Sequence, residues 1–325
     1  MAALEDYQAK FRRLNRDRLN PWPASTLGRA PHKAFLLLAV FDLIEEGTLT
    51  ENFVEITPDL GDVFGIYWSK LMPLDQPGNL AMPFFHLKSE GFWHLQARPD
   101  KEAILESSRA VTSLPALRDL ILGARLDDEL FALLCDPATR QILRITLIEA
   151  CFAPQVHALL LEQSAVNVEA FQYSAALLEQ AKDRRIEENI QIESAKSAVR
   201  DQGFRRAVVT AYNHRCAMCG VRILTSDGHT AVDAAHIKPW SVSKNDDPRN
   251  GFALCKLCHW TFDEGLTGVS PQFTVVVSQQ MATNDNLPGY LVTLAQRPIF
   301  KPDDKGLWPD VNMVKWHYEK IFRKR

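Results

Sequence analysis

Long hydrophobic runs are missing from this chain of 325 residues. The longest apolar run, from Ala34 to Phe41, is far shorter than the roughly 20 residues that a membrane-spanning helix needs. Residues 1–20 are charged and lack the apolar stretch of a secretion signal. We therefore expect a soluble, cytoplasmic protein that does not enter a membrane. Internal repeats and low-complexity stretches are also lacking, and 46% hydrophobic with 24% charged residues is average for a globular chain.

The chain also lacks a strong excess of either charge, since its formal net charge is −3. That balance is unusual for a DNA-binding protein, but the charges are unevenly distributed. Residues 196–325 hold 18 Lys and Arg against 12 Asp and Glu, whereas residues 1–195 hold 19 against 28. Residues 1–33 are basic, with 7 against 3. We expect phosphate contacts in the two basic regions, although scattered solvated charge explains the N-terminal arm equally well.

Cysteine is scarce, and four of the six cysteines stand in two Cys-x-x-Cys pairs. The pairs are Cys216 with Cys219 and Cys255 with Cys258, with 35 residues between them. Two such pairs supply the four thiolates of a tetrahedral structural zinc site. Such a site would contribute about 10–16 kcal/mol of apparent metal-binding free energy to folding. Disulfides or a redox dithiol are the alternatives, and the missing secretion signal favours zinc.

The other two cysteines, Cys135 and Cys151, lie in apolar helical stretches, so we expect both to be small buried hydrophobic residues. Between the two zinc pairs, residues 232–237 predict a short strand, and residues 243–249 form a polar, turn-rich segment. A second strand at 252–254 and a helix at 257–266 follow. The segment therefore contains strand, loop, strand and helix in that order.

These motifs resemble the HNH endonuclease family, in the branch with an Ala-Ala-His core and a four-cysteine zinc site. The resemblance covers about residues 200–270 and includes Tyr212–Cys216 before the first cysteine pair and Phe262–Gly265 after the second. It implies a ββα-metal nuclease fold. It also implies hydrolysis of DNA phosphodiesters with a divalent ion, Mg²⁺ or alternatively Mn²⁺, Co²⁺ or Ni²⁺.

By this resemblance, His236 is the general base that removes a proton from the attacking water, which a neutral imidazole does near pH 7. Asn250 orients that imidazole through a hydrogen bond, and His259 binds the catalytic metal ion. Asp263 lies four residues after His259 on the same helical face, and Asp233 is a further candidate carboxylate. The three roles of base, orienting residue and metal ligand would then meet in one local unit.

Structural roles are the alternatives for these residues. His236 taken alone is compatible with an ordinary strand histidine, and Asp263 with a helix carboxylate that bonds to nearby backbone or a basic side chain. Ala235 stands where some relatives have a metal ligand, so the remaining metal ligands stay open.

The N-terminal half predicts a mostly helical unit with a small sheet. Helices are expected at residues 32–46, 58–71, 126–134 and 137–152. The first is apolar nearly all round and should be buried. A short strand is expected at 53–56, and a hairpin at 83–87 and 92–96 around Ser89–Gly91.

This half resembles the sulfur-binding domain of phosphorothioate-dependent restriction endonucleases, which is commonly joined to an HNH domain. The resemblance covers about residues 10–155, and the segments that carry it are Pro31–Lys33 with its helix, Met82–Leu87, Gly91–Trp93 and the helix that ends at Phe152. A pocket of apolar edges favours the larger, more polarizable sulfur over a phosphate oxygen, which would lose its water there at a cost of about 1–3 kcal/mol.

By the same resemblance, Pro83 forms part of the sulfur cup, Met82 and His86 flank it, and His32 with Lys33 holds the DNA backbone. A strand-edge proline is the alternative for Pro83. Core packing is the interpretation that we favour for the aromatic residues around it, which are Phe84, Phe85, Phe92 and Trp93.

The predicted fold class is α+β in three parts. Residues 1–160 are a recognition domain, 161–200 a helical linker that could also join two copies in a homodimer, and 201–325 an HNH domain with structural zinc. We expect the linker to end at Gly203 and a strand at 273–277. The predicted function is a modification-dependent restriction endonuclease that binds phosphorothioated double-stranded DNA. The alternatives are an HNH nuclease for methylated or unmodified DNA and a zinc-stabilised DNA-binding protein that does not cleave.

Overall fold

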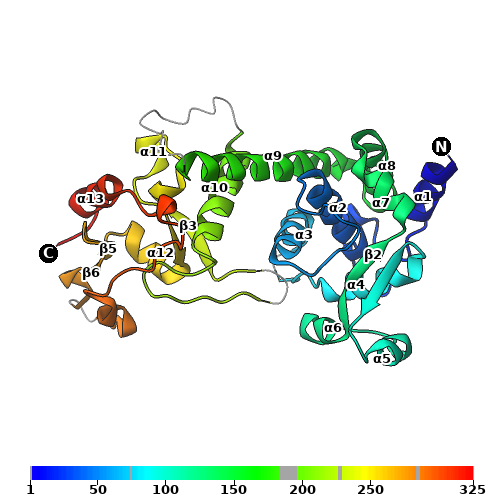
Figure 1. The fold of residues 1–325 in the computed structure, drawn as a ribbon, viewed down its shortest axis with the longest axis horizontal. Helices are drawn as coiled ribbons and strands as arrows, with labels where there is room; N and C mark the ends of the chain where they lie inside the picture. Colours follow the sequence, from blue (N-terminus) through cyan, green and yellow to red (C-terminus); the bar gives the residue numbers. More distant parts are fainter. Residues whose placement is uncertain (1, 74, 183–195, 226–228, 283–285, 325) are drawn as a thin grey trace. The chain divides into compact units, whose positions relative to one another are not determined.

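The computed structural model describes residues 2–73, 75–182, 196–225, 229–282 and 286–324. The chain divides into two compact units (Figure 1). Unit 1 contains Met1–Val168 and Thr225–His229, and unit 2 contains Glu169–Leu224 and Thr230–Arg325. Mixed helices and small antiparallel sheets agree with the expected α+β class. No described helix is long and apolar enough to cross a membrane.

Unit 1 is a helical domain with one two-stranded sheet. Its helices are α1 (Ala2–Arg12), α2 (His32–Glu45), α3 (Pro58–Leu71), α4 (Ala81–His86), α5 (Glu102–Ser107), α6 (Leu114–Leu120), α7 (Asp128–Cys135) and α8 (Pro137–Cys151). Strands β1 (Trp93–Ala97) and β2 (Ile121–Leu126) pair antiparallel. The predicted helices at 32–46, 58–71, 126–134 and 137–152 are confirmed as α2, α3, α7 and α8.

Helix α2 forms the centre of unit 1. All side chains from Ala34 to Phe41 are fully buried, because helices α3, α4, α7 and α8 all pack against α2. Helices α3 and α8 each begin with a proline in the first turn behind a capping side chain, Thr57 and Asp136 respectively, which accepts a hydrogen bond from a free backbone N–H. These local signals explain why the two helix starts could be predicted.

One buried carboxylate on α2 forms hydrogen bonds with the long helix that comes after α8, α9 (His157–Lys182). Asp42 is fully buried and accepts hydrogen bonds from Tyr67, Ser164 and Asn167 at 2.6–2.8 Å. Arg144 pairs with the same carboxylate at 3.1 Å. Four donors therefore satisfy a charge that would otherwise be very costly to bury.

The hairpin predicted at 83–87 and 92–96 is wrong. The first half is helix α4, followed by a 3₁₀ turn at Leu87–Glu90, and β1 pairs with β2 instead. Asn79 caps α4 by accepting hydrogen bonds from the N–H groups of Ala81 and Met82. Pro83 therefore lies in the first turn of a helix, which tolerates its missing N–H, and is not a strand-edge proline. The aromatic residues around it are fully buried, as expected for core packing, with Phe84, Phe85 and Phe92 at 0% and Trp93 at 1% exposure.

Three smaller expectations also fail. Residues 53–56 contribute only an isolated bridge at Val54. Cys135 is exposed at the end of α7, whereas Cys151 is buried as expected. Gly203 does not end the linker, because it lies inside helix α10 (Ser197–Ala211), where a Cβ atom would come within 2.8 Å of the Ala170 carbonyl oxygen. The close approach of α9 and α10 requires a glycine there.

Unit 2 contains the rest of α9, α10 and a hairpin followed by a helix. Strands β3 (Val232–His236) and β4 (Gly251–Cys255) pair antiparallel, with His236 opposite Gly251, and helix α12 (Lys256–Asp263) follows directly. Helix α10 packs against both strands. The remaining elements are α11 (Trp240–Ser243), β5 (Thr267–Val269), β6 (Val275–Val277) and α13 (Val311–Lys320). Residues 183–195, within the expected linker, lie outside the described residues.

Candidate active site and metal centre

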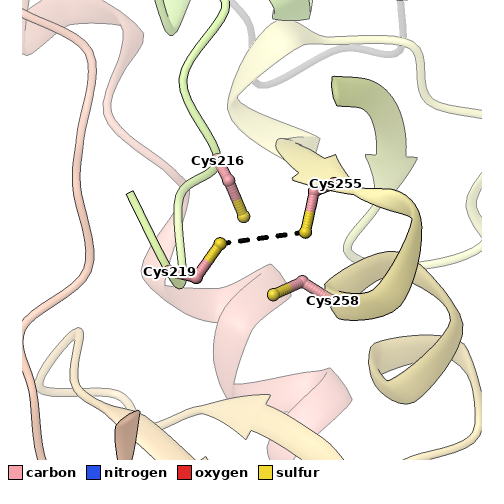
Figure 2. Close-up of side chains that lie close together, drawn as sticks. All are labelled: Cys216, Cys219, Cys255 and Cys258. Atoms are coloured by element: carbon pink, nitrogen blue, oxygen red, sulfur yellow. Dashed lines mark hydrogen bonds between the residues drawn. The ribbon is translucent and has the colours of Figure 1, made fainter. Parts of the chain in front are cut away.

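The four paired cysteines converge on one point (Figure 2). Their Sγ atoms all lie within 4.8 Å of one another, and the Sγ atoms of Cys219 and Cys255 are 3.7 Å apart. All six cysteines are free of disulfides. Four sulfurs at about 2.3 Å from a tetrahedral zinc ion would lie about 3.8 Å from one another. The cluster is therefore compatible with a structural zinc ion.

Local structure brings the two pairs together. The first pair lies on a tight turn in which the N–H of Gly220 donates to the Cys216 carbonyl at 3.0 Å, and Gly220 adopts the left-handed conformation that favours glycine. In the second pair, Cys255 ends β4 and Cys258 lies in the first turn of α12. The N–H of Ala217 also donates to the Ala253 carbonyl at 2.8 Å, which joins the turn to β4. The cysteine cluster thus lies at the start of the helix that carries His259.

His236 ends strand β3 and is held on two sides. Its ring stacks on Phe204 of α10, with centroids 3.8 Å apart and planes 11° from parallel. Its Nε2 atom lies 2.8 Å from Oδ1 of Asp246. The imidazole retains 24% exposure and is therefore partly accessible to solvent.

Asn250 does not make the expected hydrogen bond to His236. Its side-chain oxygen accepts from the N–H of Lys238 at 2.9 Å, and its amide nitrogen donates to the carbonyls of Lys238 and Asn245 at 3.0 Å each. The buried amide therefore fixes the loop between β3 and β4. The family resemblance implied a direct contact with His236, but three loop backbone groups bond to the amide instead.

Asp246 is the partner of His236 that sequence reasoning missed. It is buried at 5% exposure, and its second oxygen accepts from the Tyr173 hydroxyl at 3.0 Å. Arg200 contacts that oxygen through Nε at 3.3 Å. The sequence signal was only an Asp-Asp pair in a polar loop, where capping of a turn is the ordinary role, as the neighbouring Asp247 shows by accepting from the N–H of Arg249.

The two candidate metal ligands on α12 lie together. Nε2 of His259 is 3.4 Å from Oδ2 of Asp263, one helical turn later, and their side chains are 28% and 60% exposed. Burial raises the pKa of Asp263, while the nearby His259 acts in the opposite direction. An imidazole and a carboxylate on one accessible face are suitable donors for a divalent ion.

The third candidate, Asp233, is separate from this pair. It is exposed on β3 and pairs with Arg205 of α10 at 3.0 Å. Since residues 233 and 236 differ by an odd number of positions along the strand, their side chains point to opposite faces. A shared metal site for Asp233 and the His236 edge is therefore not favoured by the strand geometry.

The predicted recognition residues of unit 1 line one cavity. Its volume is about 790 Å³, and its walls include His32, Lys33, Met82, Pro83 and His86. Met82 and His86 lie four positions apart on α4, so they share a face, while His32 and Lys33 begin α2. Other lining residues include Arg16, Asp17, Trp22 and Asn79.

The charge of this cavity is nearly balanced. His32 lies between Trp22 and Trp68, with ring centroids at 5.2 Å and 4.5 Å, and burial lowers its pKa from 6.5 to about 4. It is therefore neutral at pH 7 and not half of a basic pair. Lys33 is paired with Glu90, and both side chains are nearly buried at 10% and 9% exposure.

The guanidinium group of Arg16 is also buried at this cavity, and it donates to the backbone carbonyls of Cys151 and Ala150 at 2.8 Å and 3.2 Å. Asp17 accepts from the N–H of Leu19 and from the side chains of Asn20 and Trp22, and these hydrogen bonds lower its pKa. The cavity thus combines apolar walls with a few oriented polar groups, as ligand sites commonly do.

Comparison with known proteins identifies the segment that contains the cysteines, His236, Asn250 and His259. A family profile described as HNH endonuclease matches residues 216–270. These residues form an HNH endonuclease domain, the domain of a nuclease that hydrolyses DNA.

No curated protein matches the chain. Among solved structures, a "Modification dependent TagI restriction endonuclease" shares 20% sequence identity over 36% of this chain and 37% of that chain, with a TM-score of 0.27. The chain therefore spans just over a third of that structure's length.

Proposed function

We propose that the protein is a modification-dependent restriction endonuclease, in which unit 1 binds phosphorothioated DNA and unit 2 hydrolyses the phosphodiester bond. In this proposal β3, β4 and α12 constitute the ββα-metal fold, and the four cysteines hold a structural zinc ion that stabilises it. The geometry around His236 supports the nuclease part, and the cavity in unit 1 supports the choice of DNA.

In the proposed mechanism, His236 is the general base. Its partly exposed ring takes the proton of a water molecule that attacks phosphorus, while Phe204 and Asp246 hold the ring. Asn250 acts indirectly, by fixing the loop that carries Asp246. His259 and Asp263 would hold a divalent ion such as Mg²⁺ or Mn²⁺, Co²⁺ or Ni²⁺. When bound, such an ion stabilises negative charge on the phosphate and the leaving oxygen.

The cavity of unit 1 carries the phosphorothioate proposal. The resemblance proposes two separate sets of residues for sulfur recognition, and all of them line a single cavity: His32 and Lys33, and Met82, Pro83 and His86. Its apolar walls and neutral His32 offer little to a strongly hydrated phosphate oxygen. They suit a sulfur atom that is more polarizable and less dependent on hydrogen bonds.

A gel shift with one duplex, with and without a single Rp phosphorothioate, tests this recognition. We expect preferential binding of the modified duplex and a loss of that preference in Pro83→Ala or Lys33→Ala. Lys101→Ala is the matched control, because Lys101 is also ion-paired in unit 1 but does not line the cavity. Equal affinity for both duplexes would refute phosphorothioate recognition and leave a nuclease for methylated or unmodified DNA.

Cleavage itself is tested separately with plasmid DNA in Mg²⁺, Mn²⁺, Co²⁺ or Ni²⁺. We expect metal-dependent nicking by the wild-type protein and a loss of about 10²–10⁴-fold in His236→Ala. If both proteins are equally inert on modified and plain DNA, the chain is better described as a zinc-stabilised DNA-binding protein.

A further inference from the structure

We infer that Asp246 is a positioning residue for the proposed general base, and that it fixes the proton of the His236 ring on Nε2. The other ring nitrogen, Nδ1, is then the one that accepts the proton from water. This inference rests on the proposed function, because it concerns the same histidine. It adds a residue and a tautomer that the HNH assignment does not contain.

The geometry of the pair sets the tautomer. Nε2 of His236 and Oδ1 of Asp246 are 2.8 Å apart, and the aspartate side chain is only 4% exposed. An ionised carboxylate accepts hydrogen bonds and has no proton to donate. A neutral imidazole facing it must therefore carry its proton on Nε2, which leaves the lone pair on Nδ1.

The carboxylate is itself held in place. Its second oxygen, Oδ2, accepts from the Tyr173 hydroxyl at 3.0 Å and lies 3.3 Å from Nε of Arg200. Burial raises the pKa of Tyr173, so the phenol keeps its proton and remains a donor. Arg200 is held in turn by stacking its guanidinium 3.6 Å from the centre of the Trp240 ring. Both oxygens of Asp246 are thus engaged, and the carboxylate has little freedom to rotate.

These supports come from outside the segment that defines the HNH domain. Tyr173 belongs to α9, and Arg200 and Phe204 belong to α10, whereas the family match begins at residue 216. Gly203 allows this arrangement, since a Cβ atom there would lie 2.7 Å from the Tyr173 ring. The HNH segment therefore supplies the histidine and the aspartate, and two preceding helices set their orientation.

Asp246→Asn tests the inference, with Asp247→Asn as the matched control. Both aspartates are 5% exposed and adjacent, but Asp247 pairs with Arg249 instead of His236. The new amide can donate to Nε2 and so favour a proton on Nδ1, the wrong nitrogen. We expect kcat for DNA cleavage to fall by about 10²–10⁴-fold in Asp246→Asn, the range for loss of a general base or its tautomer. The DNA Kd and the Tm should change little, and Asp247→Asn should stay within about threefold of wild type.

Two further variants test how strongly the donors to Asp246 contribute to kcat. Tyr173→Phe and Arg200→Gln each remove one donor to Asp246 and should lower kcat by about 3- to 10-fold, which is the size of a typical hydrogen-bond contribution. The DNA affinity of these variants at low salt separates a positioning role from a binding role. If Arg200 bound a phosphate, its loss in Arg200→Gln would raise the Kd for DNA and leave kcat unchanged.

The tautomer can be observed without activity. Histidine side-chain ¹⁵N NMR at neutral pH should show His236 protonated on Nε2 in the wild type and shifted toward Nδ1–H in Asp246→Asn. A wild-type ring protonated on Nδ1, or full kcat in Asp246→Asn, would overturn the inference. An Nε2–H tautomer in a protein that cleaves no DNA would instead reject the proposed function while leaving the positioning by Asp246 intact.

Discussion

His317 is a buried histidine whose environment makes stability depend on pH. It is 3% exposed, and its ring stacks on Phe262 with centroids 3.7 Å apart. Nε2 lies 3.2 Å from the Phe262 carbonyl oxygen, and no partner is found for Nδ1 among the described residues. Burial lowers the pKa of His317 from 6.5 to about 4.

We expect the free energy of unfolding to fall as pH drops from about 6.5 toward 4. The unfolded chain takes up a proton on this histidine near pH 6.5, whereas the folded chain does not until about pH 4. Each pKa unit corresponds to about 1.4 kcal/mol, so the loss between pH 7 and pH 5 is about 2 kcal/mol. Urea unfolding of wild type and His317→Phe at both values measures it. An equal pH dependence in the variant would contradict this assignment.

The residues of the candidate site were predictable to different degrees. His236, Asn250, His259 and the four cysteines could be proposed from spacing and resemblance, because their residue types are rare and their chemistry is specific. Asp246 could not, since aspartate in a polar loop most often caps a turn. Tyr173 lies 73 positions away from Asp246, and no local pattern predicts a contact at that separation.

At the scale of elements, the cysteine cluster joins the turn at 216–219 to the end of β4 and the start of α12. Unit 2 has small strands, of three to five residues each. Such short strands contribute little stability alone, so a bound zinc ion would account for much of the folding free energy of this region.

We expect about one zinc ion per chain and its loss in Cys258→Ser. The variant should also lose much of the stability of unit 2, since structural zinc contributes about 10–16 kcal/mol of apparent binding free energy. Metal analysis and thermal unfolding of the purified proteins measure both effects. Cys135→Ser, which changes an exposed cysteine outside the cluster, should retain the metal and the Tm. Zinc-free protein with wild-type stability would rule out a structural zinc role.

The packing of α9 against α10 at Gly203 leads to a second prediction at the scale of elements. In Gly203→Ala the added methyl group would lie 2.7 Å from the Tyr173 ring and 2.8 Å from the Ala170 carbonyl, so α9 and α10 must separate slightly. We expect a destabilisation of about 1–3 kcal/mol, typical of overpacking, together with a lower kcat from the displaced Tyr173. Ala198→Gly, at an exposed position of the same helix, controls for helix propensity alone and should cost about 1 kcal/mol of stability or less. Unchanged stability in Gly203→Ala would show that the two helices adapt without strain.

Most helices were predictable, whereas the sheet of unit 1 was not. Periodic apolar spacing, prolines and capping residues are local signals, and they mark α2, α3 and α8 well. The β1–β2 pairing joins Trp93 to Leu126 and depends on contacts far apart in sequence. Apolar residues around Pro83 suggested a strand, but burial of neighbouring Phe84 and Phe85 on one helix satisfies the same pattern.

At the scale of the whole molecule, the proposed function places recognition and cleavage in different units. The cavity residues belong to unit 1, and His236 with its supports belongs to unit 2. We therefore expect the two activities to be separable by mutation.

His236→Ala should bind a phosphorothioate duplex as tightly as wild type while its cleavage rate falls by about 10²–10⁴-fold. Lys33→Ala should show the opposite, a raised Kd for the modified duplex with kcat at saturating DNA within about threefold of wild type. Titration by fluorescence anisotropy in Ca²⁺ measures the Kd for the duplex. Cleavage at saturating DNA in Mg²⁺ measures kcat. Loss of both activities in Lys33→Ala with an unchanged Tm would indicate that they cannot be separated.

Helix α9 has a consequence for protein engineering. It holds Asn167, bonded to Asp42 of unit 1, and Tyr173, bonded to Asp246 of unit 2, only six positions apart. A chimaera that transplants residues 216–270, or even a fragment starting at α10, would leave Tyr173 behind. If unit 2 is the nuclease, as proposed, a transplanted fragment should begin near Glu169, where this unit starts inside α9, and the fusion junction should preserve the helical phase there.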